Sequence, residues 1–171
     1  MNILILSDSH GRADFVGEAV ERCKPDLVLF SGGGLRDLAY TDLPCPLFAV
    51  RGNCDFSPPP LPHGGEATDE LLIPIEGMKI LLLHGHNHGV KVGLGRVVQR
   101  AVQLDADAVV FGHTHLPLDV RLSPDSSDGL GALLTKPLHL FNPGSLRDYP
   151  HSFGVLTLRQ GVPLFSHGQL D

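Results

Sequence analysis

Short apolar runs that end in glycine or polar residues, and then in a potential metal ligand, constrain this chain more than any other feature. The side chains that follow these runs are Asp8 and His10, Asn53, His84, and His113 and His115. Strands of α/β sheets bring ligand-binding side chains together at their carboxyl ends, even when these side chains are far apart in sequence. The pattern therefore predicts an α/β protein with a functional site at its strand ends.

The apolar pattern predicts strands and helices that leave these residues in loops. Buried strands are expected at Asn2–Ser7, Leu27–Phe30, Pro46–Val50 and Ala108–Phe111, a hairpin at Leu71–Ile75 and Met78–Leu83, and helices at Ala13–Cys23 and from about Val92 to Leu104. Further short strands are expected near Asp119–Leu122, Leu138–Phe141, Phe153–Leu158 and Pro163–Phe165. Ser57–Asp69 and Ser123–Gly131 are rich in turn residues and are expected to be loops.

Length and composition limit the class of protein. A chain of 171 residues, 42 % of them hydrophobic, can form one good core, so we expect one domain over residues 1–171. The opening segment lacks a basic leader and no apolar stretch is long enough for a bilayer span, so no membrane association is expected. The 3 cysteines lack a CxxC spacing, which argues against disulfides and favours a cytoplasmic protein. The net charge of -6 argues against nucleic acid as a partner.

Two pairs of potential ligands, Asp8 and His10 and then His113 and His115, are each separated by one residue. Such pairs can leave a strand end on the same side and hold one metal, or supply one ligand to each of two metals. Asp8-Ser9-His10 alone is equally compatible with a helix N-cap. The other interpretations concern isolated histidines, which are taken as solvated at His63, His151 and His167 and as pointing outward from a strand at His139.

Several motifs follow one another in order along nearly the whole chain. They are DSH at Asp8–His10, GG at Gly32-Gly33, GNCD at Gly52–Asp55, HGH at His84–His86, GHTH at Gly112–His115 and FNPGS at Phe141–Ser145. As a set they resemble the motifs of calcineurin-like metallophosphoesterases, and among these the small YfcE-type phosphodiesterases. The resemblance implies a four-layer αββα sandwich, in which two mixed β-sheets pack face to face and are flanked by helices. It also implies a metal-dependent phosphoesterase, and more specifically a phosphodiesterase, acting on a small-molecule phosphoester.

The resemblance further implies two divalent metal ions at these motifs. Asp8, His10 and His115 would hold one ion, and Asn53, His84 and His113 would hold the other. Manganese is the expected metal, with iron, zinc, cobalt or nickel as alternatives. Two such ions lower the pKa of water and stabilise charge on the attacking and leaving oxygens of a phosphoester.

One position departs from the family pattern, because the aspartate that bridges both metals is replaced here by Gly33. Two cations about 4 Å apart then lack a screening negative charge, so weaker metal occupancy and reduced activity are expected. Asp8, a hydroxide, a phosphate or Asp37 could take over the bridge. If helical geometry begins at Gly34, however, the favoured interpretation of Asp37 is a surface carboxylate.

Three further residues are candidates for catalytic roles. His86 is expected to contact the phosphate or to donate a proton, and Asp55 is expected to orient a neighbouring histidine. Cys54 stands where many family members have a phosphate-contacting histidine, and the YfcE-type members also have cysteine there. Arg51 and Arg147 could bind phosphate, but a surface role is favoured for both.

Other interpretations stay open at this point. The missing carboxylate is also compatible with a catalytically impaired scaffold for protein binding, as in Vps29-like proteins, which resemble this family. Ser31–Gly34 suggests a phosphate-binding glycine loop, although the spacings of nucleotide-binding motifs are absent. The resemblance is compatible with a homo-oligomer, and it leaves the natural substrate undetermined.

Overall fold

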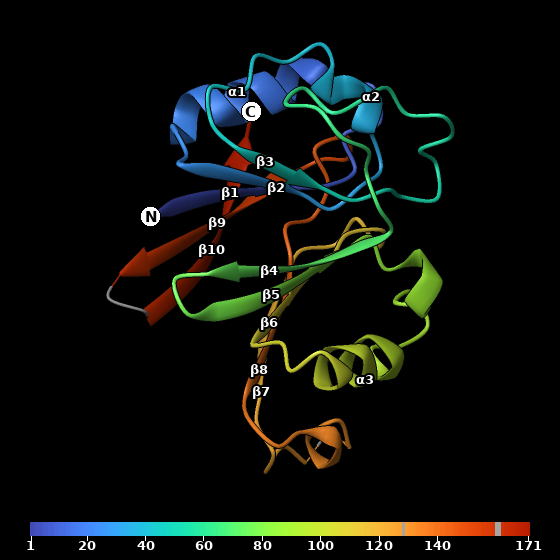
Figure 1. Ribbon diagram of the computed structural model, residues 1–171, viewed down its shortest axis with the longest axis vertical. Coiled ribbons are helices and arrows are strands. Elements are labelled where there is room, and N and C mark those ends of the chain that lie inside the picture. The colour runs from blue at the N-terminus through green and yellow to red at the C-terminus, as the bar shows by residue number, and fades with distance from the viewer. Residues whose placement is uncertain (128, 160–161) are drawn as a thin grey trace.

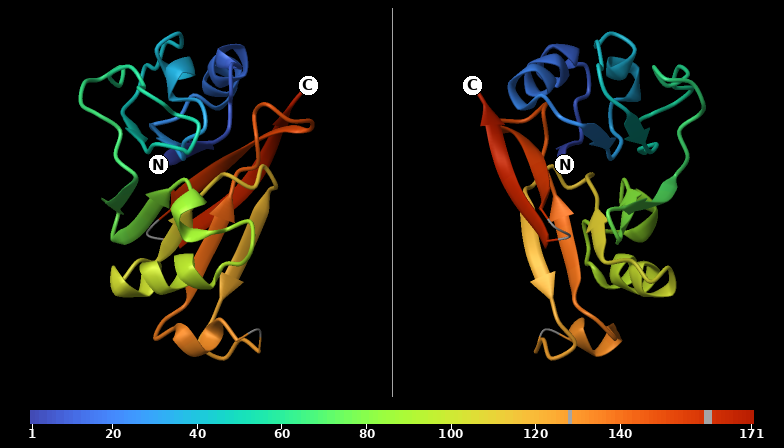
Figure 2. Two further views of the ribbon diagram at one scale, coloured as in Figure 1. Left: turned by 90° about the vertical axis from the view of Figure 1, so that its right-hand side faces the viewer. Right: turned by 60° about the vertical axis from the view of Figure 1, so that its left-hand side comes forward.

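The computed structural model describes residues 1–127, 129–159 and 162–171, so Asp128 of the loop expected at Ser123–Gly131 lies outside the described residues. Two five-stranded sheets pack against each other, and helices cover their outer faces (Figures 1 and 2). The strand order is β10-β9-β1-β2-β3 in the first sheet and β4-β5-β6-β8-β7 in the second. This arrangement confirms the expected α/β fold with two mixed sheets packed face to face.

Each sheet combines parallel strands with antiparallel neighbours. The first sheet contains β1 (Asn2–Leu6), β2 (Leu27–Phe30) and β3 (Leu47–Ala49), which are parallel, then β9 (His151–Arg159), antiparallel to β1, and β10 (Val162–Leu170), antiparallel to β9. The second sheet contains the hairpin β4 (Glu70–Ile75) and β5 (Met78–Leu83), then β6 (Ala108–Val110) and β8 (Leu138–Asn142), parallel to β5, and β7 (Leu118–Leu122), antiparallel to β8. Parallel strands end on the same side of a sheet, which determines where their following loops meet.

Helices lie on the outer face of each sheet. They are α1 (Ala13–Cys23) and α2 (Leu35–Leu38) over the first sheet, α3 (Gly95–Gln103) over the second, and the short 3₁₀ helices η1 (His86–His88) and η2 (Gly131–Leu133). The first helix ends at Lys24, which adopts a left-handed conformation before Pro25, a residue that cannot continue a helix. Among the described residues, no helix combines the length and the apolar character that a membrane crossing requires.

Successive side chains of each strand point to opposite faces of the sheet, and this alternation produces the apolar layers of the fold. Ile3 and Ile5 of β1 belong to the apolar cluster between the sheets, which also contains Phe141 of β8. Leu4 and Leu6 point to the opposite face and pack under α1 and α2. Because both faces of the central strands are covered, these strands appear in the sequence as continuous apolar runs rather than as alternating ones.

Two elements differ in extent from the sequence expectation. The helix α3 begins at Gly95, not near Val92, and the side chain of Val92 is almost fully exposed in the preceding turn. The strand β10 extends to Leu170, well beyond the expected Pro163–Phe165. It forms one edge of its sheet, and most of its side chains are exposed, so apolar patterning did not mark its full length.

Candidate metal centre

The side chains predicted to form a site lie after strands of both sheets, at the junction between them. Asp8 and His10 follow β1, Asn53 follows β3, His84 follows β5, and His113 follows β6. The main-chain N–H of His113 donates to Asp8 Oδ2 over 2.9 Å, so the two sheets are hydrogen-bonded to each other at this point. The candidate site therefore spans two layers of the fold instead of lying on one sheet.

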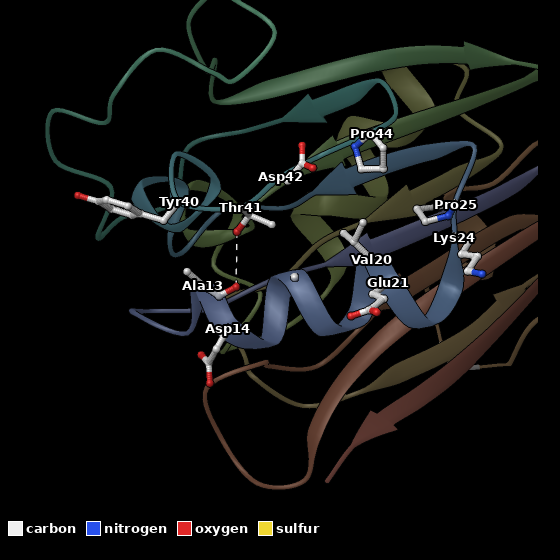
Figure 3. A pocket seen from close by; sticks show the side chains of 11 residues that line it. Ala13, Asp14, Val20, Glu21, Lys24, Pro25, Tyr40, Thr41, Asp42 and Pro44 are labelled. Atoms are coloured by element: carbon white, nitrogen blue, oxygen red, sulfur yellow. Dashed lines mark hydrogen bonds between the residues drawn. The ribbon is translucent and has the colours of Figure 1, made fainter.

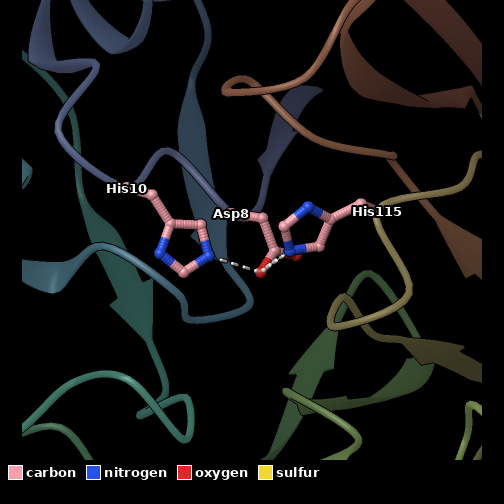
Figure 4. Close-up of side chains that lie close together, drawn as sticks. All are labelled: Asp8, His10 and His115. Atoms are coloured by element: carbon pink, nitrogen blue, oxygen red, sulfur yellow. Dashed lines mark hydrogen bonds and ion pairs between the residues drawn. The ribbon is translucent and has the colours of Figure 1, made fainter.

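Asp8, His10 and His115 form the tightest group of potential metal ligands (Figure 4). Asp8 Oδ1 lies 3.3 Å from His10 Nε2 and 3.2 Å from His115 Nε2, and the ligand atoms of all three residues lie within 4.8 Å of one another. The carboxylate is fully buried, whereas both imidazoles are partly exposed. One oxygen and two nitrogen donors with an open side suit a divalent transition metal that also binds water.

The Asp8 carboxylate is held in place from its other side. Asp8 Oδ2 accepts hydrogen bonds from Ser7 Oγ at 2.5 Å and from the His113 amide, which directs Oδ1 toward the imidazoles. Burial by itself would raise the pKa of Asp8, but hydrogen bonds from His10 and His115 outweigh it and hold this pKa far below its usual value. The carboxylate is thus ionised at neutral pH, which is the form that binds a cation.

A second group of acceptors faces the first. His84 Nδ1 donates to the Ser31 carbonyl over 2.7 Å, so Nε2 of the neutral ring carries its lone pair. This Nε2 lies 3.1 Å from Asn53 Oδ1 and 3.9 Å from Asp8 Oδ1, both of which are acceptors. Burial lowers the pKa of His84 and keeps its ring neutral. Acceptors directed at one another without a proton between them fit a cation, so these residues fit the metal that the sequence predicts.

His113 extends this second group. Its ring centroid lies 5.0 Å from that of His84. Burial and the neighbouring His84 lower the pKa of His113 from 6.5 to about 4. A neutral imidazole with a free nitrogen is the form that binds metals, so the surroundings of His113 favour the ligating state over the protonated one.

Left-handed backbone conformations recur at the ligand positions. The φ angles are 53° at Asp8, 39° at His10, 67° at His113 and 62° at His115. Residues with a Cβ atom are strained in this region by about 1 kcal/mol or more each, and such residues cluster at functional sites. Both pairs of ligands therefore have the backbone strain that is typical of functional sites, a feature that residue spacing alone does not reveal.

The surface interpretation of Asp37 is wrong. Its side chain is buried, and Oδ2 accepts hydrogen bonds from Ser9 Oγ at 2.6 Å and from the Gly11 amide at 2.9 Å. Asp37 thus fixes the loop that carries Asp8 and His10. The N-cap interpretation of this loop is also wrong, because α1 is preceded by Arg12 without a side-chain cap.

Asp55 does not orient a histidine as expected. Among the described residues, its carboxylate accepts hydrogen bonds only from main-chain amides, at distances of 2.8 to 2.9 Å, and the donors are Gly33, Gly34, Leu35 and Gly52. The glycine loop after β2 therefore binds a carboxylate of its own chain, which argues against its use as a nucleotide phosphate loop. Cys54 is exposed, and its sulfur accepts a hydrogen bond from the Asn53 amide at 3.4 Å.

Gly33 faces the candidate centre. A Cβ atom at this position would lie 2.4 Å from Asp8 Oδ1, and the backbone has a φ of 78°. Glycine permits this close approach because it has no side chain and tolerates positive φ. A longer residue at position 33 would extend toward Asp8, although Asp8 would then have to shift.

Two residues beside the centre were missed from the sequence. Asp148 Oδ2 hydrogen-bonds His115 Nδ1, and this contact, together with the stronger one to Asp8, raises the pKa of His115. Lys91 lies close enough to His113 for its charge to help lower the pKa of that ring. Asp148 follows the FNPGS motif by three positions, which was the available signal, whereas nothing in the sequence marked Lys91.

His86 lies next to the second group of acceptors. Its ring centroid is 5.4 Å from that of His84 and 6.1 Å from that of His113. Its Nδ1 atom is buried and has no hydrogen-bond partner among the described residues. Arg51 and Arg147 are both exposed, and Arg51 pairs with Asp69, which agrees with the surface role favoured for them.

The histidines outside the centre have contacts of their own. His63, His151 and His167 each hydrogen-bond a main-chain carbonyl, and the last two pack against phenylalanine rings. His139 does not point outward, because its ring lies 4.1 Å from that of Phe165 and Nε2 lies 2.6 Å from Asp119 Oδ1. His63 and His167 are exposed, whereas His139 and His151 are partly buried, and the exclusion of all four from the site stays a prediction.

A groove of about 690 Å³ lies between α1 and the segment after α2 (Figure 3). Asp14, Glu21 and Asp42 give its wall an acidic character, and Thr41 Oγ1 hydrogen-bonds the Ala13 carbonyl across it at 3.5 Å. None of the six candidate ligands lines this groove. Cavity size therefore does not locate the candidate chemistry, which lies at the strand ends.

Two packed mixed sheets with a buried carboxylate and several imidazoles at their strand ends agree with the class expected from the sequence motifs, the metallophosphoesterases. Comparison with known proteins agrees. The profile of the calcineurin-like phosphoesterase superfamily domain matches residues 1–161, and the chain belongs to this family. The probable metallophosphoesterase YsnB of Bacillus subtilis (strain 168) is 34 % identical over 164 residues, which are 92 % of this chain and 85 % of that protein.

Solved structures share the fold at lower identity. A novel archaeal phosphodiesterase has a TM-score of 0.70 and 19 % identity, with 99 % of this chain and 100 % of that chain covered. Vps29 from Entamoeba histolytica has a TM-score of 0.68 and 19 % identity, with 100 % of both chains covered. The likeness at these identities concerns the fold, so the function has to be argued from the site.

Proposed function

We propose that this protein is a metal-dependent phosphodiesterase with a dinuclear centre that lacks a bridging carboxylate. The observation that carries the proposal is the cluster of acceptors around Asp8. His84 Nε2, Asn53 Oδ1 and Asp8 Oδ1 lie within 3.1 to 3.9 Å, while the only ring donor of neutral His84 is used by the Ser31 carbonyl. A cation relieves this repulsion, and a group of histidines with a carboxylate supplies its ligands.

Asp8, His10 and His115 would hold one cation, and Asn53, His84 and His113 the other. When bound, divalent cations lower the pKa of water and neutralise charge on a phosphoester. The lowered pKa values of His84 and His113 keep both rings available as ligands. Manganese is the metal we propose, because mixed oxygen and nitrogen donors suit it, as they also suit iron, zinc, cobalt and nickel.

His86 is the residue we assign to the substrate. Its ring lies beside those of His84 and His113, and its buried Nδ1 atom has no partner among the described residues, so this nitrogen can contact a phosphate oxygen or pass a proton to a leaving group. Cys54 is exposed next to Asn53, and its sulfur accepts a hydrogen bond from the Asn53 side chain, so we assign the contact with the substrate to His86 and not to Cys54. Proton donation by His86 favours substrates that have a strongly basic leaving group.

The absence of a carboxylate at Gly33 determines how tightly the centre is expected to bind its metal ions. Asp8 is the only anionic side chain among the six proposed ligands. Two cations roughly 4 Å apart repel each other, and one carboxylate screens this repulsion less than two do. We therefore expect one tightly bound ion at Asp8, His10 and His115, and a second ion that binds more weakly.

The test is hydrolysis of bis-p-nitrophenyl phosphate by protein stripped of metal and then given Mn²⁺, with bound metal measured on the same samples. We expect turnover that depends on Mn²⁺ and falls by at least ~100-fold in His113→Ala, because ligand loss costs more than loss of a ligand's hydrogen-bond partner. His63→Ala is the control, since His63 is exposed and bonds only the Cys45 carbonyl.

The same experiment separates the alternatives. Mn²⁺ binding without turnover of any phosphoester would favour the protein-binding scaffold. Turnover that persists in His113→Ala or in metal-free protein would place the chemistry elsewhere and contradict the proposed centre.

A further inference from the structure

An apolar groove of about 600 Å³ opens next to the candidate metal centre. Its lining includes Val90, Lys91, Phe111, Thr114, Leu116 and Leu118. Thr114 lies between the proposed ligands His113 and His115 in the chain, so the loop that holds the ligands is also a wall of the groove. We call this recess the Leu116 groove.

The Leu116 groove combines a buried base with an exposed apolar rim. Phe111 and Val90 are buried, whereas Leu116 has an exposed fraction of 70 %. An exposed leucine beside a recess is covered when a ligand with apolar surface binds, because removing apolar area from water is favourable. The position of the recess beside metal ligands makes it a place for part of a substrate.

One cation belongs to the lining of the groove. Lys91 lines the groove together with Thr114, the residue between the proposed ligands His113 and His115. It forms no salt bridge among the described residues. In a chain with a net charge of -6, a lysine that forms no salt bridge among the described residues and lines an apolar recess favours a ligand with an anionic group and an apolar group.

We propose that the Leu116 groove binds an apolar ester group of the substrate, while Lys91 contacts a non-bridging oxygen of the phosphate held at the centre. This inference rests on the proposed function, because it requires a phosphoester at the metal centre. The lining of the recess is mostly apolar, so the part of the substrate that enters it is an apolar group and not a second charged one.

The test compares the binding of phenylphosphonate and methylphosphonate to the Mn²⁺-loaded protein by calorimetry, since these probes share their anionic head and differ only in the apolar group. We expect phenylphosphonate to bind ~10-fold more tightly, a typical discrimination for an apolar pocket. Leu116→Ser removes most of this preference. Leu164→Ser, which alters a similarly exposed leucine at 66 % on β10, leaves the preference unchanged.

A second variant tests the contact with the anionic group of the ligand separately from the contact with its apolar group. Lys91→Gln weakens the binding of both phosphonates by the same factor, because the lysine contacts only their shared anionic group.

Equal affinities of the two phosphonates for the unaltered protein would overturn the groove proposal and leave the metal centre intact. Failure of both phosphonates to bind would instead count against the proposed function. If Leu116→Ser changed the sedimentation coefficient and not the preference, the groove would be an interface between copies of the chain.

Discussion

Asp8 links the two groups of proposed ligands, since one of its oxygens faces His10 and His115 and the other accepts the amide of His113. Its neighbours could be predicted from the sequence, because strand-end positions and spacing mark Asp8, His10 and His84. The contacts that orient them could not be predicted. Asp148 is held beside His115 by a loop whose conformation depends on tertiary packing, and positive φ angles at the ligands leave no trace in residue type.

Asp148 tests whether a carboxylate behind His115 contributes to metal binding. We expect Asp148→Asn to weaken Mn²⁺ binding by about 10-fold, because the carboxylate fixes the tautomer that directs His115 Nε2 toward Asp8. Asp119→Asn is the matched control, since Asp119 makes the same type of contact with His139. Titration calorimetry with Mn²⁺ measures both variants, and equal affinities for Mn²⁺ in the two would show that Asp148 has no such role.

Gly33 tests the explanation offered for a weak second metal. We expect Gly33→Asp to lower the melting temperature of metal-free protein, because its carboxylate would crowd Asp8 and the backbone there is left-handed. With Mn²⁺ added, the same carboxylate attracts the cations, so the metal-induced rise in melting temperature exceeds that of the unaltered protein. Gly64→Asp, at a φ of 86° with open space around it, controls for backbone strain. Metal-induced rises that match in all three proteins would refute the explanation.

At the scale of elements, the continuous apolar runs predicted the central strands and the hairpin, because strands covered on both faces need apolar residues at every position. The same reasoning missed most of β10, which is exposed, and the 3₁₀ helix η1 that carries His86 and His88. The loop after β2 was also misread, since its glycines suggested a phosphate site and the structure shows Asp55 bound there.

Asp55 is predicted to stabilise the connection between β2 and α2. We expect Asp55→Ala to lower the free energy of unfolding by roughly 3 kcal/mol, because four main-chain amides lose a charged acceptor. Urea unfolding of metal-free protein measures this loss. Asp69→Ala is the control, since Asp69 forms an exposed pair with Arg51 and exposed pairs contribute little. A loss as small as that of Asp69→Ala would mean that the amides find other acceptors.

At the scale of the whole molecule, the centre lies between sheets that are otherwise held together by an apolar interior. The fold followed from this interior, which one chain of this length can build, while the single domain over residues 1–171 stays a prediction. The expectation of a homo-oligomer stays a prediction, as do the cytoplasmic location and the metal.

The stability of metal-free protein is predicted to depend on acidity through the imidazoles of the centre. The pKa of His113 falls from 6.5 to about 4 on folding, so the unfolded chain binds more protons between these values and stability decreases as the pH falls through them. The raised pKa of His115 acts in the opposite sense and stabilises the fold at lower pH. We expect urea unfolding of His113→Asn to show a weaker dependence between pH 6.5 and 4 than the unaltered protein. The variant His63→Asn keeps the full dependence, and a dependence unaltered in His113→Asn would contradict the assignment.

Each proposed metal set takes ligands from both sheets, with Asp8 and His10 opposite His115, and Asn53 opposite His84 and His113. A small slip of one layer over the other would separate these partners even if every strand kept its hydrogen bonds. The affinity for the cation then depends on how well the interior is packed. Shortening a core side chain such as Phe141 would weaken metal binding first, before any loss of secondary structure.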